Sequence, residues 1–188
     1  SSLTGNSAGF DGGAIASEAD TLRIIQSTLD QNSAVETGGG LLIRNGSVVV
    51  ENSTFSANRT TDDSIGQGGA IAVTGGGLEL RHATLTLNES QFAGGVLSAG
   101  GTPAAVGNSI IAGNLDNLGS PDVSGSFASS DGNLIGDGSG AIGFDGAADQ
   151  VGSGIAPIDP LLGPLAFQDA NDFTQTHLPQ QFSPAIDR

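Results

Sequence analysis

The chain of 188 residues contains no Cys, Met, Trp or Tyr, and its aromatic rings come mainly from 8 Phe. Without Cys the protein forms no disulfide and carries out no thiolate chemistry. It has no apolar run of about 18 residues, so no membrane-spanning segment is expected. Its five basic residues are all Arg and face 20 Asp and Glu, for a formal net charge of −15. Such a chain repels nucleic acid and anionic lipid and attracts cations.

What the sequence does contain is a repeat. Asparagines recur at steps of 26, 26, 30 and 26 residues, and an apolar residue stands three positions before each one. They are Asn6, Asn32, Asn58, Asn88 and Asn114. A fixed period of 20–50 residues indicates stacked supersecondary units. We interpret the series as a structural ladder at one tight turn, in which each amide bonds to the next and the Asn adopts the left-handed conformation.

Each repeat carries the pattern of short strands. Apolar residues alternate before each Asn, as in Leu22/Ile24 and Val48/Val50, which is the period of a strand with one buried face. A Gly-Gly phrase supplies a further strand and recurs as 12–15, 39–42, 68–71 and 94–97. No helical period is present. The pattern predicts an all-β parallel β-solenoid with three short strands per coil.

The repeat also predicts how the single domain is organised. Residues 1–114 form regular coils, 115–154 an irregular last coil with a Gly/Asp-rich loop, and 155–188 an extended C-terminal cap. Five of the 7 Pro lie in the last segment, and proline blocks continued strand pairing. We expect this cap to wrap the last coil and to cover its open edge. The chain begins inside a repeat, so we expect a processed product or a fragment of a longer protein.

Two places depart from the repeat and are candidate sites. The 30-residue step reflects an insertion in 59–67, and insertions in solenoids often carry binding. Its candidate residues are Arg59, Asp62, Asp63 and Gln67; the alternative is a tolerated loop. The second place is the Gly/Asp-rich stretch, whose carboxylates could converge on Ca²⁺, the one cofactor that the sequence suggests. These candidate ligands are Asp131, Asp137, Asp145 and Asp149; the alternative is a set of polar turns.

No catalytic residues are predicted. The chain has no Lys to act as a base, and Asp62 and Asp63 would point apart as neighbours on an extended chain. The only histidines are His82 and His177. His82 is expected in a turn column with Gln26 and Asn52, and His177 is expected to pack in the tail.

Several phrases resemble known families. Gly-Gly-Ala-Ile (12–15 and 68–71) and Phe-x-x-Asn (55–58) resemble the repeats of polymorphic outer-membrane proteins. The C-terminal third resembles the choice-of-anchor Q domain. It carries, in order, Gly132-Asn-Leu-Ile-Gly136, Asp149-Gln-Val-Gly152, Ile158-Asp-Pro-Leu-Leu-Gly-Pro-Leu165, Thr174-Gln-Thr-His177 and Ser183-Pro-Ala-Ile-Asp187. The resemblance implies a right-handed parallel β-helix and a secreted or cell-surface location. It implies no reaction and no catalytic residue.

These observations favour a non-enzymatic, extracellular bacterial surface segment: a stalk, an adhesin or a self-assembling fibre subunit. Its expected partners are a cell-surface glycan or protein, or copies of itself stacked head to tail. The alternative is a carbohydrate-active or carbohydrate-binding module of the pectate-lyase-like type. The absence of Trp and Tyr counts against that alternative, because sugar rings commonly stack on such side chains.

Overall fold

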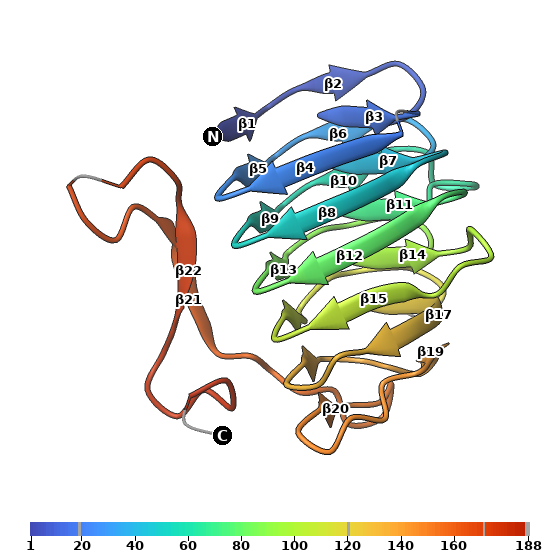
Figure 1. The fold of residues 1–188 in the computed structure, drawn as a ribbon. Helices are drawn as coiled ribbons and strands as arrows, with labels where there is room; N and C mark the ends of the chain where they lie inside the picture. Colours follow the sequence, from blue (N-terminus) through green and yellow to red (C-terminus); the bar gives the residue numbers. More distant parts are fainter. Residues whose placement is uncertain (19, 120, 171, 187–188) are drawn as a thin grey trace.

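The computed structural model describes residues 1–18, 20–119, 121–170 and 172–186. Over these residues the chain is all-β, without helices, and it forms a parallel β-solenoid (Figure 1). The predicted fold class is therefore confirmed. None of the described segments is a helix that could cross a membrane. The last two residues of the predicted cap, Asp187 and Arg188, lie outside the described part of the chain.

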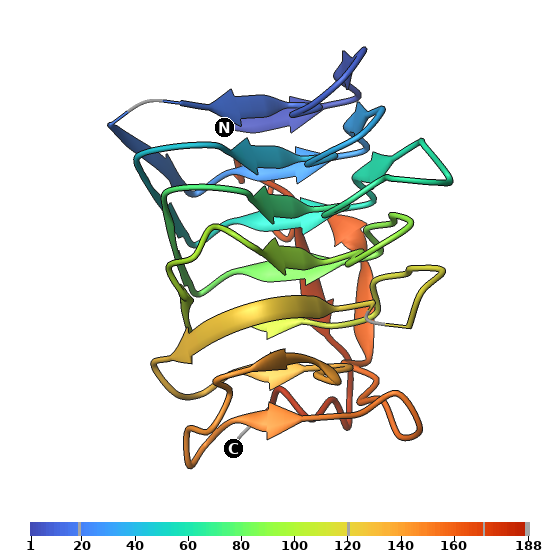
Figure 2. The same cartoon turned by 90° about the vertical axis from the view of Figure 1, so that its right-hand side faces the viewer.

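Three long columns of parallel strands build the solenoid (Figures 1 and 2). Sheet I contains β1 (Ser2–Thr4), β5 (Thr28–Asp30), β9 (Thr54–Ser56), β13 (Thr84–Thr86), β16 (Ile110–Ile111), β18 (Leu134–Ile135) and β20 (Gln150–Val151). Sheet II contains β3 (Ile15–Ser17), β7 (Leu41–Ile43), β11 (Ile71–Val73), β14 (Val96–Ser98), β17 (Val123–Ser129) and β19 (Gly140–Ile142). Sheet III contains β4 (Thr21–Ile25), β8 (Ser47–Glu51), β12 (Gly77–Arg81) and β15 (Ala104–Gly107), and the second half of β17 joins it.

A fourth, shorter column was not predicted. It consists of β2 (Ser7–Ala8), β6 (Ser33–Ala34) and β10 (Arg59–Thr60), each of which directly follows a ladder asparagine. These strands are two residues long, too short to show the alternation from which strands are recognised in a sequence.

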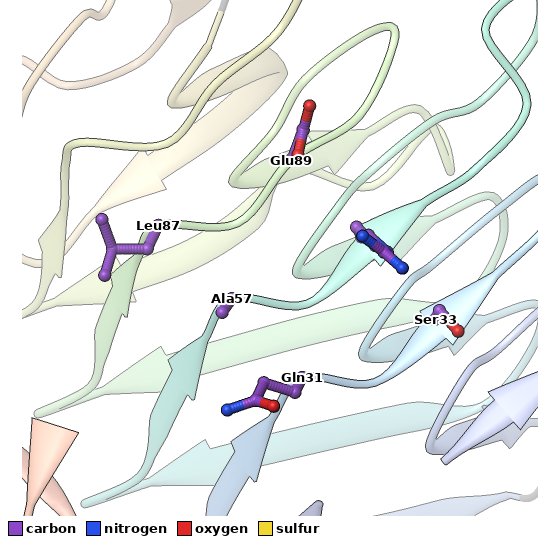
Figure 3. A pocket seen from close by; sticks show the side chains of 6 residues that line it. Gln31, Ser33, Ala57, Leu87 and Glu89 are labelled. Atoms are coloured by element: carbon purple, nitrogen blue, oxygen red, sulfur yellow. The ribbon is translucent and has the colours of Figure 1, made fainter. Parts of the chain in front are cut away.

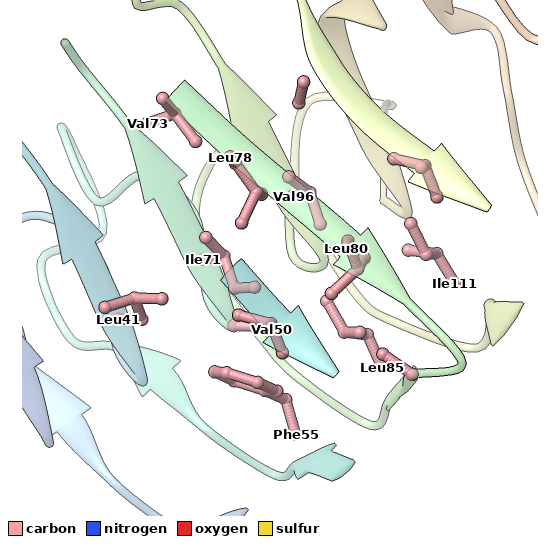
Figure 4. Packing of buried hydrophobic residues seen from close by; sticks show 14 of the residues in the cluster. Leu41, Val50, Phe55, Ile71, Val73, Leu78, Leu80, Leu85, Val96 and Ile111 are labelled. Atoms are coloured by element: carbon pink, nitrogen blue, oxygen red, sulfur yellow. The ribbon is translucent and has the colours of Figure 1, made fainter. Parts of the chain in front are cut away.

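The core runs along the axis between the sheets (Figure 4). The strands of sheet I point one side chain inward from each coil, and Leu29, Phe55 and Leu85 are fully buried in register. Val48 and Val50 of sheet III are also fully buried, as their alternation predicts. Phe127 and the half-buried Phe144 stack with ring centroids 4.9 Å apart near the C-terminal end of this core.

The asparagine ladder is confirmed, but the left-handed residue is not the asparagine. In successive coils the residue before it has a positive φ, as in Gln31 (54°), Ala57 (52°) and Leu87 (60°). The turn is made one position earlier because the asparagine side chain must point inward to reach the next coil. Asn32, Asn58 and Asn88 are accordingly fully buried.

The Gly-Gly phrases also need a correction of register. Strand pairing aligns Ile15 with Leu41, Ile71 and Val96, so the predicted phrases at 39–42 and 94–97 lie one residue too late in the chain. The aligned triplets are 12–14, 38–40, 68–70 and 93–95. Their first residue has a positive φ, which Ala93 adopts in the fourth coil. Their second residue is Gly in every coil, because the backbone of the next coil passes close to it.

The C-terminal segment does not form the predicted cap. After the last coil the chain forms an antiparallel hairpin, β21 (Leu162–Ala166) and β22 (Thr176–Pro179), which we call the strap. The strap lies flat beside sheet I and runs back along the solenoid toward the first coils (Figures 1 and 2). It binds there because outward-facing hydroxyl groups of sheet I offer hydrogen bonds to its backbone, as in the contact of Thr28 with Gln175.

Candidate functional site

The polar interior of the solenoid ends on a buried carboxylate. Each ladder asparagine donates its backbone N–H and its side-chain N–H to the Oδ1 of the next one. The last bonds, from Asn114 N and Nδ2, go to Asp122 Oδ1 at 2.9 and 2.8 Å, and Asp122 Oδ2 accepts from Asp137 N at 2.7 Å. Asp122 therefore occupies the acceptor position of a sixth asparagine. All three of these partners donate, so a carboxylate fits where an amide would not.

A second ladder follows the other edge of sheet I. It is interrupted at Ala83, which has no side-chain acceptor, and it ends in the same way. Ser27 N donates to Ser53 Oγ, and Ser109 N donates to Asn133 Oδ1. Asn133 then donates from N and Nδ2 to Asp149 Oδ1 at 2.9 and 3.0 Å. Asp149 Oδ2 accepts from Ser129 Oγ and Gly146 N. Neither terminal aspartate could be found as a ladder member by period, because each follows its partner by 8 or 16 residues rather than 26.

The candidate calcium ligands are not gathered into a metal site. Within the described residues, no group of three or more His, Cys, Asp and Glu side chains could hold a metal ion. Asp149 ends the second ladder, Asp131 Oδ1 accepts from Gly132 N and Ala148 N, and Asp137 Oδ1 accepts from Ser139 N. These carboxylates hold turns by accepting backbone hydrogen bonds, the alternative that the sequence left open.

Two buried carboxyl groups titrate abnormally. Burial raises the pKa of Asp122 above its ordinary value, although hydrogen bonds from Asn114 and Asp137 N act to lower it. Burial beneath the strap likewise raises the pKa of Asp30, while the nearby His177 and a hydrogen bond with Gln31 act in the opposite direction. Both groups are more easily protonated in the folded chain than in an unfolded one.

These shifts predict that the protein is more stable in mild acid. A carboxyl with a raised pKa binds more protons when folded, so the stability that it contributes is lost as pH rises from the unfolded pKa through the folded one. We expect the Tm at constant ionic strength to be higher at pH 5 than at pH 7. The lower net charge at pH 5 acts in the same direction. Asp30→Asn should reduce the difference; a lower Tm at pH 5 would contradict the prediction.

The residues of the predicted binding loop lie in separate places. Arg59 lines a groove of about 340 Å³ beside the turn that carries the ladder asparagines (Figure 3). The other lining residues are Gln31, Ser33, Ala57, Leu87 and Glu89. Asp62 Oδ1 accepts from Ser64 N and Ile65 N and so holds the turn of the inserted loop. Gln67 is bridged to Thr37 and Phe92 within the stack, and Asp63 is exposed. The structure does not gather these four residues into one site.

The strap is fixed to sheet I by a buried histidine. His177 is 6% exposed; its Nδ1 donates to Gly163 O at 2.7 Å, and its Nε2 lies 3.0 Å from Ser56 Oγ. A serine and a histidine at this distance could act as nucleophile and base. Ser56 is only 2% exposed beneath the strap, however, so the contact serves to anchor the strap. The sequence predicts packing for His177 but not its partner, which is 121 residues away.

Two cavities lie where the strap and the residues that follow it meet the turns before sheet I. These turns form a column of exposed side chains with positive φ, Gln26, Asn52, His82 and Asn108, which confirms the predicted position of His82. Near the first coils, a cleft of about 630 Å³ separates Gln26 and Asn52 from Asp172 and Phe173 of the strap. Near the last coils, a cavity of about 300 Å³ lies beside Asn108, Gln150 and Ala185.

Of these places, the larger cleft has the chemistry of a binding site. It is open, and it brings amide, carboxylate and aromatic side chains from opposite ends of the sequence into one space. No sequence pattern indicates this cleft, because the sequence predicts the C-terminal segment at the other end of the solenoid. Comparisons of the chain with protein-family models, curated proteins and solved structures give no match. The chain is therefore described by its fold alone, a parallel β-solenoid.

Proposed function

We propose that the chain is a non-enzymatic display segment, a rigid β-solenoid that spaces or presents a binding surface outside a bacterial cell. The observation that carries the proposal is the unbroken Asn6–Asp122 ladder, which links successive coils beside the seven strands of sheet I. Coils that each bond to their neighbours through backbone and side chain form a stiff rod.

The buried polar side chains already make structural hydrogen bonds, which supports a display function rather than catalysis. Asp122, Asp149 and His177 are held in structural hydrogen bonds, and Ser56 is covered by the strap. A surface location is supported by the absence of Cys and by the phrases shared with polymorphic outer-membrane and choice-of-anchor Q proteins, and membership of those families is part of the proposal.

We keep the head-to-tail fibre as a second version of this proposal. In that version the first coil of one copy would stack on β20, the last strand of sheet I, of the next copy.

A distance measurement tests the rigid-rod proposal. The chain has no Cys, so Arg23→Cys and Ala128→Cys create a unique pair for spin labels on exposed positions of one column. Arg23, Val49, Glu79, Ala105 and Ala128 are in register, and four steps of ~4.8 Å place the two backbones about 19 Å apart. We expect one narrow distance peak. A broad or multiple distribution contradicts a rod, and turnover of polygalacturonate or a neutral polysaccharide favours the enzyme alternative.

A further inference from the structure

The cleft between the strap tip and the solenoid has an aromatic wall. Phe173 precedes β22 and is 90% exposed, although a Phe ring is a large apolar surface. Ile25, which is 41% exposed, lines the same cleft from the end of β4. An exposed ring that borders a cleft of about 630 Å³ offers an apolar face to a ligand rather than to the core.

The opposite wall presents side-chain amides from two adjacent coils. Gln26 and Asn52 follow β4 and β8, whose last residues are in register, so their backbones are one coil step of ~4.8 Å apart. Both have a left-handed backbone, with φ of 45° and 49°, and both are exposed. Each amide offers two N–H donors and one carbonyl acceptor. This wall can therefore bond to groups that both donate and accept.

A carboxylate completes the cleft. Asp172 Oδ2 accepts from Gln168 N at 2.9 Å and from Asp169 N at 2.8 Å, which fixes the side chain within the strap tip. The carboxylate borders the cleft beside Phe173. Ser1 also lines the cleft, where its amino group donates to Gln26 O at 2.9 Å. The Asp172 carboxylate accepts hydroxyl donors, and the net charge of −15 of the whole chain disfavours acidic ligands.

We propose that this cleft is a binding site for a neutral saccharide. The Phe173 ring packs against the C–H face of a sugar ring, and Gln26, Asn52 and Asp172 bond to its hydroxyl groups. The site does not depend on the display function, since a cleft of this chemistry can bind sugar whether or not the solenoid acts as a spacer.

The column of exposed turn residues before sheet I sets the direction in which a longer ligand could extend. It continues from Gln26 and Asn52 to His82 and Asn108, all exposed, and Asn108 lines the second cavity of about 300 Å³. A linear oligosaccharide that enters at Phe173 can extend along this column beside the strap. We therefore expect longer oligomers to bind more tightly than the disaccharide of the same sugar.

The lack of other fluorophores makes the test direct. The chain contains no Trp or Tyr, so Phe173→Trp places the single fluorophore at the cleft. Phe182→Trp is the matched control, because Phe182, which follows the strap, is 84% exposed but does not line the cleft. Each variant is titrated with cellohexaose, chitohexaose, mannohexaose and xylohexaose, and with polygalacturonate as the acidic comparison.

The proposal expects a saturable fluorescence change with at least one neutral hexasaccharide in Phe173→Trp and none in Phe182→Trp. In calorimetry, Phe173→Ala should weaken that binding at least tenfold. Asn52→Gly should weaken it as well, while keeping a residue that tolerates the left-handed turn. An unchanged Tm shows that these variants remain folded. The proposal is overturned by no response to any neutral sugar, by equal responses in the two Trp variants, or by preference for polygalacturonate. Loss of the narrow spin-label distance would instead contradict only the display function.

Discussion

Asn58→Ala is expected to destabilise the protein by about 3–5 kcal/mol, because it removes the middle rung of the buried ladder. Asn58 is fully buried. Its Oδ1 accepts from Asn32 N at 3.1 Å and from Asn32 Nδ2 at 2.8 Å, and its Nδ2 donates to Leu29 O at 2.9 Å. Alanine removes these three bonds and the bond from Asn58 Nδ2 to Asn88 Oδ1, while Asn32 Nδ2 keeps its bond to Leu3 O. Each buried donor or acceptor that loses its partner costs about 1–3 kcal/mol.

Asn6→Ala is the matched control for this effect. Asn6 makes the same bonds to Asn32 Oδ1 but is exposed in the first coil, where water replaces a lost partner. Its substitution should cost no more than about 1 kcal/mol. Chemical denaturation of the two variants measures the difference. Similar losses for Asn58→Ala and Asn6→Ala would show that burial does not decide the strength of the ladder.

The ladder is also the part of the structure that the sequence predicts best. Asn32, Asn58 and Asn88 recur at nearly constant spacing because each must meet the one before it, and this requirement is visible in a single sequence. The inward residues Leu29, Phe55 and Leu85 are predictable for the same reason. The position of the left-handed residue is not, since Gln31, Ala57 and Leu87 share no residue type and the conformation is imposed by the turn.

Contacts between residues that the repeat does not relate could not be predicted from the sequence. Asp122 joins the ladder from a neighbouring loop, out of step with the period, and it differs from asparagine because its partners there are all donors. The C-terminal segment 155–188 carries five of the 7 prolines, which indicates an extended segment but not its direction. Its anchors, such as Ser56 with His177, join residues that no repeat relates. The cleft at Phe173 depends on that placement and was therefore invisible as well.

Gly39→Ala is expected to destabilise the protein by about 3 kcal/mol or more, because the solenoid has no room for a methyl group at this position. A Cβ on Gly39 would lie 2.5 Å from the carbonyl carbon and oxygen of Arg59, and it would also meet Gly69 O. These atoms belong to the backbone of the next coil, which is held in place by its own hydrogen bonds. Relief therefore requires neighbouring coils to separate, with loss of bonds such as Gly40 N to Gly69 O.

Gly77→Ala separates this steric effect from the general effect of replacing glycine. Gly77 begins β12, its φ is not in the left-handed range, and a Cβ there meets no atom within 4 Å. Alanine should be neutral there or stabilise the protein by about 0.4–1 kcal/mol, since it restricts the unfolded chain. Thermal and denaturant unfolding of the two variants gives the comparison. Equal stability of Gly39→Ala and Gly77→Ala would mean that the coils can move apart at little cost, and the second glycine of each aligned triplet would then need another explanation.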